Sequence, residues 1–306
     1  MIYVPAGTYD EVLDFSGKAN VEMYGAGDST VINWTGSNDY SIHIDGASSD
    51  LVLHDFKIKQ TFAHSASAIT VSSLATGHFY NINFQDVGFT AINVRGPVSQ
   101  FTTVISGIEI NNCDLGVVGD FGIYVGSGVS GVHIHDIDSW GCLGLRYPPH
   151  AIYLQDCTDI LVEDVYSEAC GTDPGSVGNG FAYKAGMDVY GYGHISDIRF
   201  VRCVSVDCWG GLWFVDADDL HATDCDFLGN TNKSVQFYSV VTNSSMVGCT
   251  FSADTASGAE GIVFVTGTGN ADYVTLTSNS AIAPLPSPVI SRGAATNLTE
   301  TGNSWN

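Results

Sequence analysis

The stretch "AIYLQDCTDILVEDVYS" (residues 151–167) holds two short segments in which apolar and other side chains alternate. In the first segment, Ile152 and Leu154 are separated by one residue, which is the period-two pattern of a strand that buries one face. The second segment (159–167) shows the same alternation after the turn-forming residues "DCTD". The stretch therefore predicts two consecutive β-strands joined by a tight turn.

The same pair of segments recurs along most of the chain. First-type segments, spaced 23 to 31 residues apart, are "SIHID" (41–45), "AITVS" (68–72), "AINVR" (91–95), "GIYVG" (122–126), "AIYLQ" (151–155), "GFAYK" (180–184), "GLWFV" (211–215), "SVQFY" (234–238) and "GIVFV" (261–265). Second-type segments follow at 50–58, 78–84, 107–115, 131–139, 159–167, 197–206, 219–227 and 243–251. Coils of about 25 residues with two or three short strands are typical of a parallel β-helix, in which each coil buries its apolar face by stacking on its neighbours.

The repeat predicts an all-β fold, a single right-handed parallel β-helix domain of about ten coils over residues 1–306. Parallel strand connections are right-handed in general, and stacking at about 4.8 Å per rung closes the core. From about residue 255 the repeat weakens and "APLPSP" (283–288) interrupts it. Residues 255–306 are therefore expected to form a cap or an oligomer contact.

Most cysteines fall into two columns when the second-type segments are aligned. One column contains Phe56, Ile82, Cys113, Ile137, Val165, Cys203, Cys225 and Cys249, and the other contains Cys142, Cys170 and Cys208. Columns of like residues are expected from stacked rungs, so buried free thiols are predicted. Disulfides between adjacent rungs are the alternative.

The chain is strongly acidic, with a net charge of −23, a pI near 4.3 and only 10 Lys and Arg residues among 306. Such a surface repels nucleic acid and anionic membranes. No apolar run reaches the roughly 18 residues of a transmembrane span, and "MIYVPAGTYD" lacks the features of a signal peptide. The charge indicates a protein adapted to a salty or extracellular setting, or one that binds divalent cations through carboxylates.

Residues that point outward from the first-type segments form two columns. Tyr124, Tyr153 and Trp213 stand in the first column around a gap at Ala182, and Arg95, Gln155 and Lys184 stand in the second. Exposed aromatic rings around a small residue are suited to stacking on sugar rings, so a substrate groove is predicted here unless a loop covers the rings. The predicted substrate-binding residues are Tyr124, Tyr153, Trp213, Gln155, Arg95 and Tyr190.

The longest loops, at 141–150, 170–179 and 185–194, lie on the same coils, and long loops often carry function. Their candidate residues, together with the carboxylate that ends the preceding segment, are Arg146, Tyr147, His150, Asp173, Asp188, Tyr190, Tyr192, His194 and Glu168.

The opening "IYVPAGTYDE" and the repeat resemble β-helical carbohydrate-active proteins of the pectate lyase superfamily and phage tailspikes. The resemblance implies a right-handed β-helix that acts on acidic or neutral polysaccharides. It also implies an extracellular or virion-associated protein, a monomer or homotrimer, with a polysaccharide as its partner. The charge and the lack of a long apolar run predict neither a nucleic acid partner nor a membrane span.

The segment "GNGFAYK" (178–184) is similar to the "DGFA-x-K" strand of family 9 polysaccharide lyases. In that family the lysine removes the proton beside a uronate carboxylate, near a calcium ion, so the resemblance makes Lys184 the base. Asn179–Gly180 stands where the motif has its aspartate. The nearest carboxylates are Glu168 and Asp173, which become the expected ligands of a Ca²⁺ cofactor.

The segment "RYPPH" (146–150) resembles the "DPH" motif of mannuronan C5-epimerases, which is followed by "DGF" in that family. The match points to His150 as a catalytic residue, although Pro148 stands in place of the family's aspartate.

A lyase that cleaves by β-elimination needs a donor or cation on the uronate carboxylate, a base for the C5 proton and an acid for the leaving oxygen. Lys184 can act as the base only if its pKa is lowered, whereas the reference pKa of His150 is already about 6.5. The plain alternatives are an exposed strand lysine for Lys184 and a loop-capping or stacked histidine for His150. The candidate catalytic residues are Lys184, His150, Arg146 and Tyr147, with Tyr190 as a second possible acid and Arg95 as a second carboxylate partner.

Two other functions are compatible with the sequence. A glycoside hydrolase or tailspike-type depolymerase needs two carboxylates across a sugar, for which the candidates are Glu168, Asp173, Asp188, Asp216, Asp218 and Asp219. A non-catalytic β-helix that only binds glycans is the third hypothesis. The sequence favours a polysaccharide lyase that acts on an acidic, uronate-containing glycan.

Overall fold

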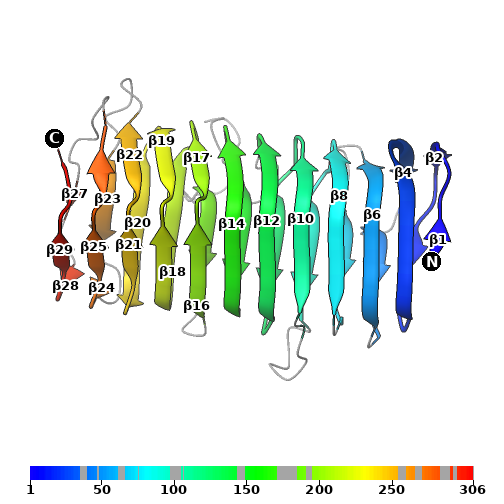
Figure 1. Cartoon of the computed structure of the whole chain (residues 1–306), viewed down its shortest axis with the longest axis horizontal. Helices are drawn as coiled ribbons and strands as arrows, with labels where there is room; N and C mark the ends of the chain where they lie inside the picture. Colours follow the sequence, from blue (N-terminus) through cyan, green and yellow to red (C-terminus); the bar gives the residue numbers. More distant parts are fainter. Residues whose placement is uncertain are drawn as a thin grey trace.

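The computed structural model describes residues 1–34, 40–46, 48–60, 66–74, 76–96, 105, 107–142, 149–170, 185–190, 195–253, 260–265, 271–282, 290–291 and 295–305. Within these ranges, strands of successive coils pair in parallel and no helix is present. The chain is an all-β parallel solenoid, and its number of turns is close to the number expected from the repeat. Figure 1 shows the rungs side by side along the long axis, from the N-terminal end to the C-terminal end.

One ladder of parallel strands, called the first ladder here, matches most of the first-type segments. It consists of β3 (Leu13–Asp14), β5 (Tyr40–Ile44), β7 (Ser67–Val71), β9 (Thr90–Arg95), β11 (Phe121–Gly126), β13 (His150–Gln155), β15 (Ala185–Tyr190), the first part of β18 (Gly210–Thr223), the first part of β20 (Lys233–Thr242), β23 (Glu260–Val265) and β27 (Ile290–Ser291). Its register aligns one inward residue per coil, as the period-two pattern predicts. These residues, each with 0% exposure, are Ile42, Ile69, Ile92, Ile123, Ile152, Met187, Leu212, Val235 and Ile262.

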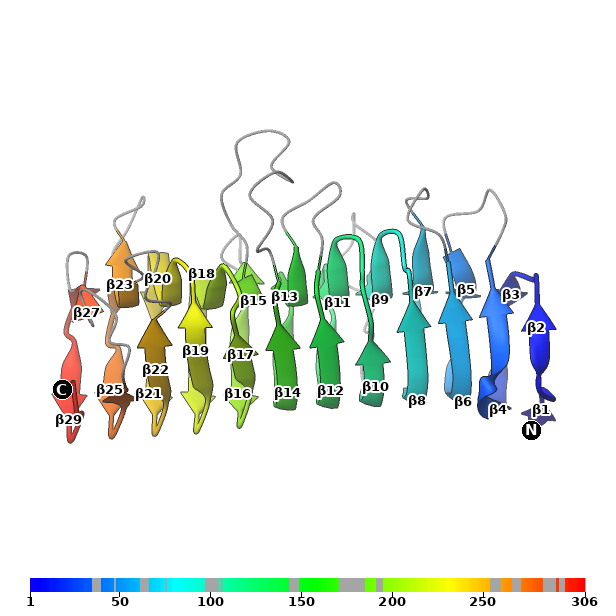
Figure 2. The ribbon, with the colours of Figure 1, turned by 90° about the horizontal axis from the view of Figure 1, so that it is seen from above.

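The second ladder begins with long strands and continues as shorter ones. It consists of β1 (Ile2–Tyr3), β2 (Gly7–Tyr9), β4 (Ala19–Asn33), β6 (Ser49–Lys59), β8 (Gly77–Gln85), β10 (Ile108–Leu115), β12 (Ser130–Trp140), β14 (Thr158–Glu168), β16 (Ser196–Val201), β17 (Val204–Val206), the second parts of β18 and β20, β19 (Asp226–Asn230), β21 (Ser245–Val247), β22 (Thr250–Ala253), β24 (Ala271–Asp272), β25 (Thr275–Thr277), β26 (Ser280–Ala281), β28 (Ala295–Thr296) and β29 (Thr299–Thr301). In Figure 2 the strands of the first ladder lie above those of the second.

Each of the strands β6, β8, β10, β12 and β14 has a residue with positive φ in its interior. This residue is Asp or Asn in successive coils, because these side chains tolerate the left-handed region better than most. These residues are Asp55, Asn81, Asn112, Asp136 and Asp164. The next residue in each coil turns inward and is buried, as the aligned column that includes Cys113 and Ile137 predicts.

All eight cysteines are free and buried, which confirms the prediction of buried thiols. The column of Cys142, Cys170 and Cys208 packs with Ala151 in a small cluster of its own. There the backbone N–H of Cys170 donates to Sγ of Cys208 at 3.4 Å. Most of the other buried apolar side chains of the described residues form one core that runs along the solenoid.

The strand predicted at 180–184 is wrong for its coil. The strand that pairs with β13 is β15, with Met187 opposite Ile152 and Val189 opposite Leu154. Residues 180–184 lie outside the described part of the chain. In this register Asp188 pairs with Tyr153.

The C-terminal coils continue the same ladders, since β25 pairs with β29 and β23 with β27. Their role as a cap or an oligomer contact stays a prediction. Among the described residues, none belongs to a helix of the length and hydropathy needed to span a bilayer.

Candidate functional site

The outward side of the first ladder brings several predicted residues together on β9, β11 and β13. Tyr124 lies directly opposite Tyr153, with ring centroids 5.5 Å apart. Gly126 lies between Arg95 on one neighbouring strand and Gln155 on the other. The strand register thus places four of the six predicted substrate-binding residues on three consecutive rungs.

His150 is part of a stack of rings at the start of these strands. Its imidazole is parallel to the ring of Phe121 at 5.9 Å and to that of Tyr153 at 5.1 Å, and it is 2% exposed. Phe121 also stacks on Tyr153 at 5.0 Å. The predicted base therefore has a fixed orientation, and other parts of the chain shield it from solvent.

The phenol of Tyr124 extends over Gly126, where no side chain occupies the space. A Cβ at Gly126 would lie 2.5 Å from this hydroxyl, so glycine is needed at this position. The hydroxyl of Tyr124 donates a hydrogen bond to Oε1 of Gln155 at 2.8 Å. Burial raises the pKa of Tyr124 although the charge of Arg95 acts to lower it, so the phenol stays protonated at neutral pH.

The prediction of an exposed aromatic groove is wrong for two of its three rings. Tyr124 is 8% exposed and Trp213 only 1%, and Trp213 packs against Trp209 with ring centroids 5.4 Å apart. Tyr153 is half-buried. A side chain that points away from a sheet can still be covered by the connections between strands. Substrate binding by these residues stays a prediction.

Six of the candidate residues lie outside the described residues, namely Lys184, Arg146, Tyr147, Asp173, Tyr192 and His194. Tyr190 ends β15, where its backbone pairs with Gln155 and Val215. His150 pairs with Ala185, which directly follows Lys184 in the sequence. The structure therefore describes the strand beside His150 as far as Ala185, the residue next to Lys184.

Glu168, a predicted calcium ligand, belongs to the second ladder. It ends β14 opposite Trp140, and its Oε2 accepts a hydrogen bond from the hydroxyl of Tyr166 at 2.6 Å. This hydrogen bond and burial raise the pKa of Tyr166 to about 12. Calcium binding by Glu168 with Asp173 stays a proposal.

The carboxylates of "DADD" (216–219), candidates for a hydrolase, have structural partners at the strand turns. Oδ1 of Asp216 accepts a main-chain N–H from the next coil, and Oδ1 of Asp218 accepts from Asn243 at 2.9 Å. Oδ1 of Asp219 lies 2.8 Å from Nε2 of His221. Asp216 and Asp219 also have positive φ, as turn residues do. These contacts favour the role of turn residues, the plain interpretation of this segment.

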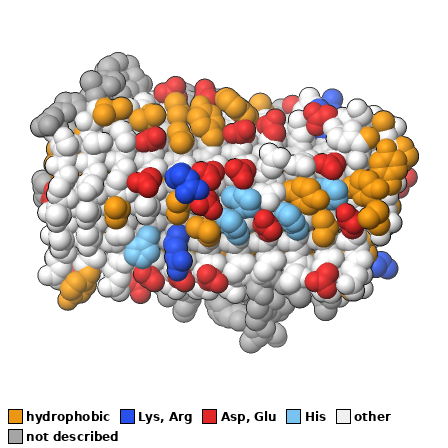
Figure 3. All heavy atoms as spheres, in the orientation of Figure 1, with side chains coloured by type: hydrophobic (Ala, Val, Ile, Leu, Met, Phe, Trp, Pro, Cys, Tyr) orange, Lys and Arg blue, Asp and Glu red, His pale blue; other side chains and the backbone are white. Residues whose placement is uncertain are grey.

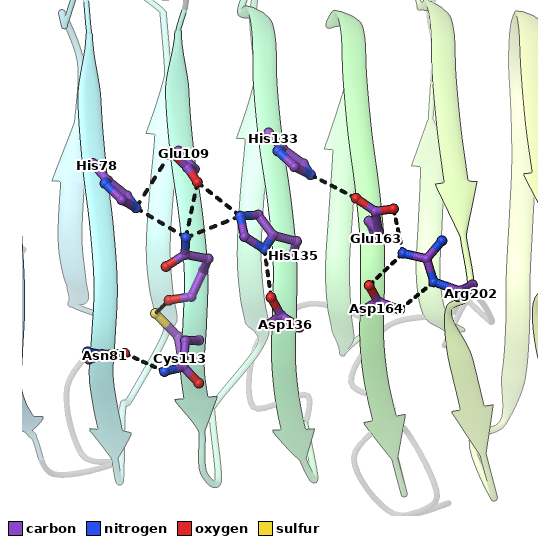
Figure 4. Close-up of polar contacts among 12 residues, drawn as sticks. His78, Asn81, Glu109, Cys113, His133, His135, Asp136, Glu163, Asp164 and Arg202 are labelled. Carbon is purple, nitrogen blue, oxygen red and sulfur yellow. Dashed lines mark hydrogen bonds and ion pairs between the residues drawn. The ribbon is translucent and has the colours of Figure 1, made fainter.

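A second group of polar residues lies on the outward side of the second ladder and was not predicted from the sequence. We call it the histidine array; its members on β8, β10 and β12 are His78, Glu109, Asn111, His133 and His135. The register places His78, Glu109 and His133 in one row, and Asn111 beside His135 in the next. Figure 3 shows the histidines gathered with charged side chains on this face, and Figure 4 shows the contacts among them.

The polar atoms of the array converge around Glu109. Its Oε1 lies 3.0 Å from Nε2 of His135, and its Oε2 lies 3.6 Å from Nε2 of His78. Nδ2 of Asn111 is 3.1 Å from each of these two imidazole nitrogens and from Oε1 of Glu109. Burial lowers the pKa of His135, but hydrogen bonds to Glu109 and Asp136 outweigh it, so the net pKa is raised.

An ion-pair network extends the array toward the C-terminal end. Oε2 of Glu163 lies 3.3 Å from Nε2 of His133, and its Oε1 accepts from Arg202 at 2.5 Å. The guanidinium of Arg202 also binds both carboxylate oxygens of Asp164, at 2.8 and 2.7 Å, and holds the pKa of Asp164 below its usual range. Aligning the outward residues of the second-type segments across coils would have revealed this cluster.

Sequence comparisons give no relative, since neither a protein-family model nor a curated protein matches the chain. Solved structures do match. The A-module of mannuronan C-5 epimerase AlgE4 from Azotobacter vinelandii has a TM-score of 0.69 at 12% identity and covers 99% of this chain and 86% of its own. The A-module of AlgE6 from the same organism has a TM-score of 0.53 at 12% identity, with coverage of 99% and 90%.

The catalytic unit of a GH87 α-1,3-glucanase from Streptomyces thermodiastaticus also matches, with a TM-score of 0.51 at 13% identity and coverage of 99% of this chain and 64% of its own. At such low identities the likeness shows the fold alone. The matching solenoids wind in the right-handed sense, which confirms the predicted hand. The chain is therefore a right-handed parallel β-helix protein with the fold that these carbohydrate-active enzymes share.

Proposed function

We propose that this protein is a polysaccharide lyase that cleaves a uronate-containing glycan by β-elimination on the outward side of the first ladder. The observation that carries the proposal is the convergence of Arg95, Tyr124 and Gln155 on three adjacent rungs, beside the ring stack of His150. A positive charge, a protonated phenol and an imidazole are the groups that this reaction needs.

The structural likeness supports the choice of uronate chemistry. The solved structure with a TM-score of 0.69 is named as a mannuronan C-5 epimerase, and mannuronan is a polymer of uronate units. Epimerisation at C5 and β-elimination both begin with removal of the C5 proton. The two reactions then diverge, because an epimerase returns a proton to C5 whereas a lyase expels the oxygen at C4.

In the proposed reaction, Arg95 pairs with the uronate carboxylate, since its exposed guanidinium can bind two carboxylate oxygens at once. His150 or Lys184 takes the C5 proton, and the electron pair of that bond forms the C4–C5 double bond. The C4–O bond then breaks, and the leaving oxygen takes a proton from a tyrosine. Tyr124 has a raised pKa and can donate this proton, as can Tyr147.

The remaining predicted residues keep their proposed roles. Arg146 would assist at the carboxylate, Tyr153 and Tyr190 would contact the sugar, and Ca²⁺ held by Glu168 and Asp173 would neutralise substrate charge. Because His150 is 2% exposed, the residues that cover it must shift before a substrate reaches the imidazole.

A panel of polyuronides and neutral glycans, each assayed with and without EDTA, tests the proposal. A lyase produces unsaturated ends that absorb near 235 nm, and calcium dependence would appear as a loss of rate in EDTA. New reducing ends without this absorbance would contradict the lyase proposal and indicate a hydrolase. Binding without any new ends would indicate a non-catalytic glycan-binding protein.

Replacing His150 by alanine tests the site itself. The loss of a general base lowers kcat by about 10²–10⁴-fold, so His150→Ala is expected to be nearly inactive on the polyuronide that the wild type cleaves. His43→Ala is the matched control, because His43 is a half-buried histidine on the outward side of the same ladder, four rungs away on β5. Full activity of His150→Ala would show that the base lies elsewhere.

A glycoside hydrolase is the second candidate function. The strand register pairs Asp188 with Tyr153 on one side and with Trp213 on the other. A carboxylate at this position is the kind of group that a hydrolase requires as an acid or base. Under this alternative, Asp188→Asn abolishes the release of reducing ends, and no product absorbs near 235 nm.

A further inference from the structure

The histidine array offers ligands from two adjacent rungs of the second ladder. Glu109 projects from β10, and His133 and His135 project from the same side of β12, separated by one residue. The ligand atoms of these three side chains all lie within 4.8 Å of one another. Two histidines in alternate positions of one strand share a face, so both rings reach a common point above the sheet.

The distances are close to those of a metal centre. Bonds of about 2.0–2.1 Å in a tetrahedral zinc site place two ligand atoms roughly 3.3 Å apart. Nε2 of His135 and Oε1 of Glu109 are already 3.0 Å apart. Rotations of the exposed ends of Glu109 and His133, which are 43% and 37% exposed, can bring the third ligand to the same separation.

Both imidazoles already have the carboxylate neighbours that orient metal-binding histidines. Asp136 contacts Nδ1 of His135 at 2.8 Å, and Glu163 contacts Nε2 of His133 at 3.3 Å. Metal-ligating histidines usually donate their second ring N–H to such a carboxylate, which fixes the tautomer and the ring orientation. In His135 the nitrogen that remains, Nε2, is the one that faces Glu109.

Asn111 lies at the centre of the array. Its Nδ2 is 3.1 Å from Nε2 of His78, from Nε2 of His135 and from Oε1 of Glu109. An amide has an oxygen acceptor beside its nitrogen donor, so with the side chain turned Asn111 would present an oxygen ligand toward the same point.

We propose that Glu109, His133 and His135 bind one divalent transition-metal ion of the zinc type, with solvent at its open coordination position. Two imidazoles and one carboxylate suit Zn²⁺, Ni²⁺ or Cu²⁺, whereas Ca²⁺ and Mg²⁺ prefer all-oxygen sites. None of these three residues belongs to the proposed lyase site. It does not depend on the proposed function.

The bound ion would tie β10 to β12 through side chains, in addition to the backbone ladder. Because the ion binds the folded chain and not the unfolded one, it raises the melting temperature as its concentration exceeds Kd. The cysteines do not compete for the metal in the native protein, since all eight are buried.

The test is a zinc titration of the metal-stripped full chain without a polyhistidine tag, by calorimetry and by competition with a chromophoric chelator. One equivalent of Zn²⁺ is expected to bind, to raise the melting temperature, and to resist displacement by excess Ca²⁺. Co²⁺ in place of Zn²⁺ should give visible absorption bands that identify nitrogen ligation. Absence of saturable binding, or displacement by Ca²⁺, would overturn the proposal.

Variants identify the ligands. Glu109→Gln keeps the shape of the side chain but removes its charge, and with His133→Ala and His135→Ala it should weaken zinc binding by at least about 10–100-fold. His221→Ala is the matched control, because this half-exposed histidine of the same ladder contacts Asp219 and Ser245 and has no third ligand beside it among the described residues. Equal zinc affinity in the wild type and in all three ligand variants, each shown to be folded by circular dichroism, would refute the site.

Discussion

Single residues decide where neighbouring coils can approach each other. At the second position of the strands in the first ladder, successive coils carry small side chains, among them Ala91, Gly122, Ala151 and Gly211. A Cβ at Gly211 would lie 2.3 Å from the carbonyl oxygen of Ser234, which is closer than any stable contact. Glycine is therefore needed there because the backbone of the next coil fills the space.

Gly211→Ala is expected to destabilise the protein by about 1–3 kcal/mol, the usual cost of forcing an extra group into a packed interior. Urea unfolding measures the change. Gly7→Ala is the control, since the nearest atom to its Cβ would be the side-chain hydroxyl of Tyr9 at 3.3 Å rather than backbone, and it should cost much less. Equal unfolding midpoints for the two variants would contradict the packing argument.

The sequence predicts well whether a side chain points into or out of the solenoid, but it does not predict how exposed that side chain is. Period two correctly places Ile123 and Ile152 inward and Tyr124 and Trp213 outward. It does not show that Tyr124 and Trp213 are covered, because covering depends on connections that fold over the sheet from other coils. The histidine array was missed for a related reason, since Glu109 and His135 are adjacent only after the coils stack.

At the scale of the element, strand assignment was correct wherever one alternating segment was available per coil. The coil after β13 offers two such segments, Phe181 with Tyr183 and Met187 with Val189. Alternation alone cannot choose between them, because both have the same period. Pairing with β13 and β18 decides the choice, and it selects β15.

The column of buried cysteines makes the free energy of unfolding depend on pH in the alkaline range. Burial raises the pKa of Cys113 to about 12, whereas an unfolded thiol loses its proton near pH 8.5. Between these values the unfolded state binds fewer protons, so the free energy of unfolding falls as the pH rises. The loss is about 1.4 kcal/mol per pH unit for each such thiol.

Cys113→Val removes one titrating thiol, and the residue opposite Cys113 in the next coil is Ile137, so an apolar branched side chain suits the column. Between pH 9 and 11 the free energy of unfolding should fall less steeply with pH in the variant than in the wild type. The two slopes should differ by about 1.4 kcal/mol per pH unit. Denaturant unfolding at a series of pH values measures both slopes. Parallel curves would show that Cys113 does not titrate on unfolding in this range.

At the scale of the whole molecule, the excess of negative charge acts against the compact state. The net charge is −23, and the solenoid stacks like charges in successive coils, as with Asp114 opposite Asp138. Burial and the neighbouring carboxylate of Asp138 raise the pKa of Asp114, which is the local result of this repulsion. Mobile ions screen it over a Debye length.

Raising sodium chloride from 10 mM to about 150 mM shortens the Debye length from about 30 Å to about 8 Å, so the melting temperature is expected to rise. Choline chloride at the same ionic strength should give the same rise if screening is the cause. A fall in melting temperature with either salt would show that attractive ion pairs, such as those of Arg202, outweigh the repulsion.

The solenoid fold could be predicted because every coil must meet the same requirement, an apolar inward side chain that stacks on the neighbouring coils. Each coil must present an apolar residue such as Ile92 or Ile152 at the same place, so the pattern is sampled many times. The candidate site, in contrast, occupies one group of rungs. Its residues, such as Arg95 and His150, carry no periodic signal, and the register of β9, β11 and β13 shows which of them are neighbours.

The most direct test of the proposed function is proton NMR of a polyuronide digested by the protein in deuterated water. We predict new vinyl signals from 4,5-unsaturated uronate ends, which grow as the chain shortens. Deuterium at C5 of an uncleaved polymer would indicate epimerisation instead. Saturated ends without vinyl signals would contradict β-elimination and leave hydrolysis as the reaction.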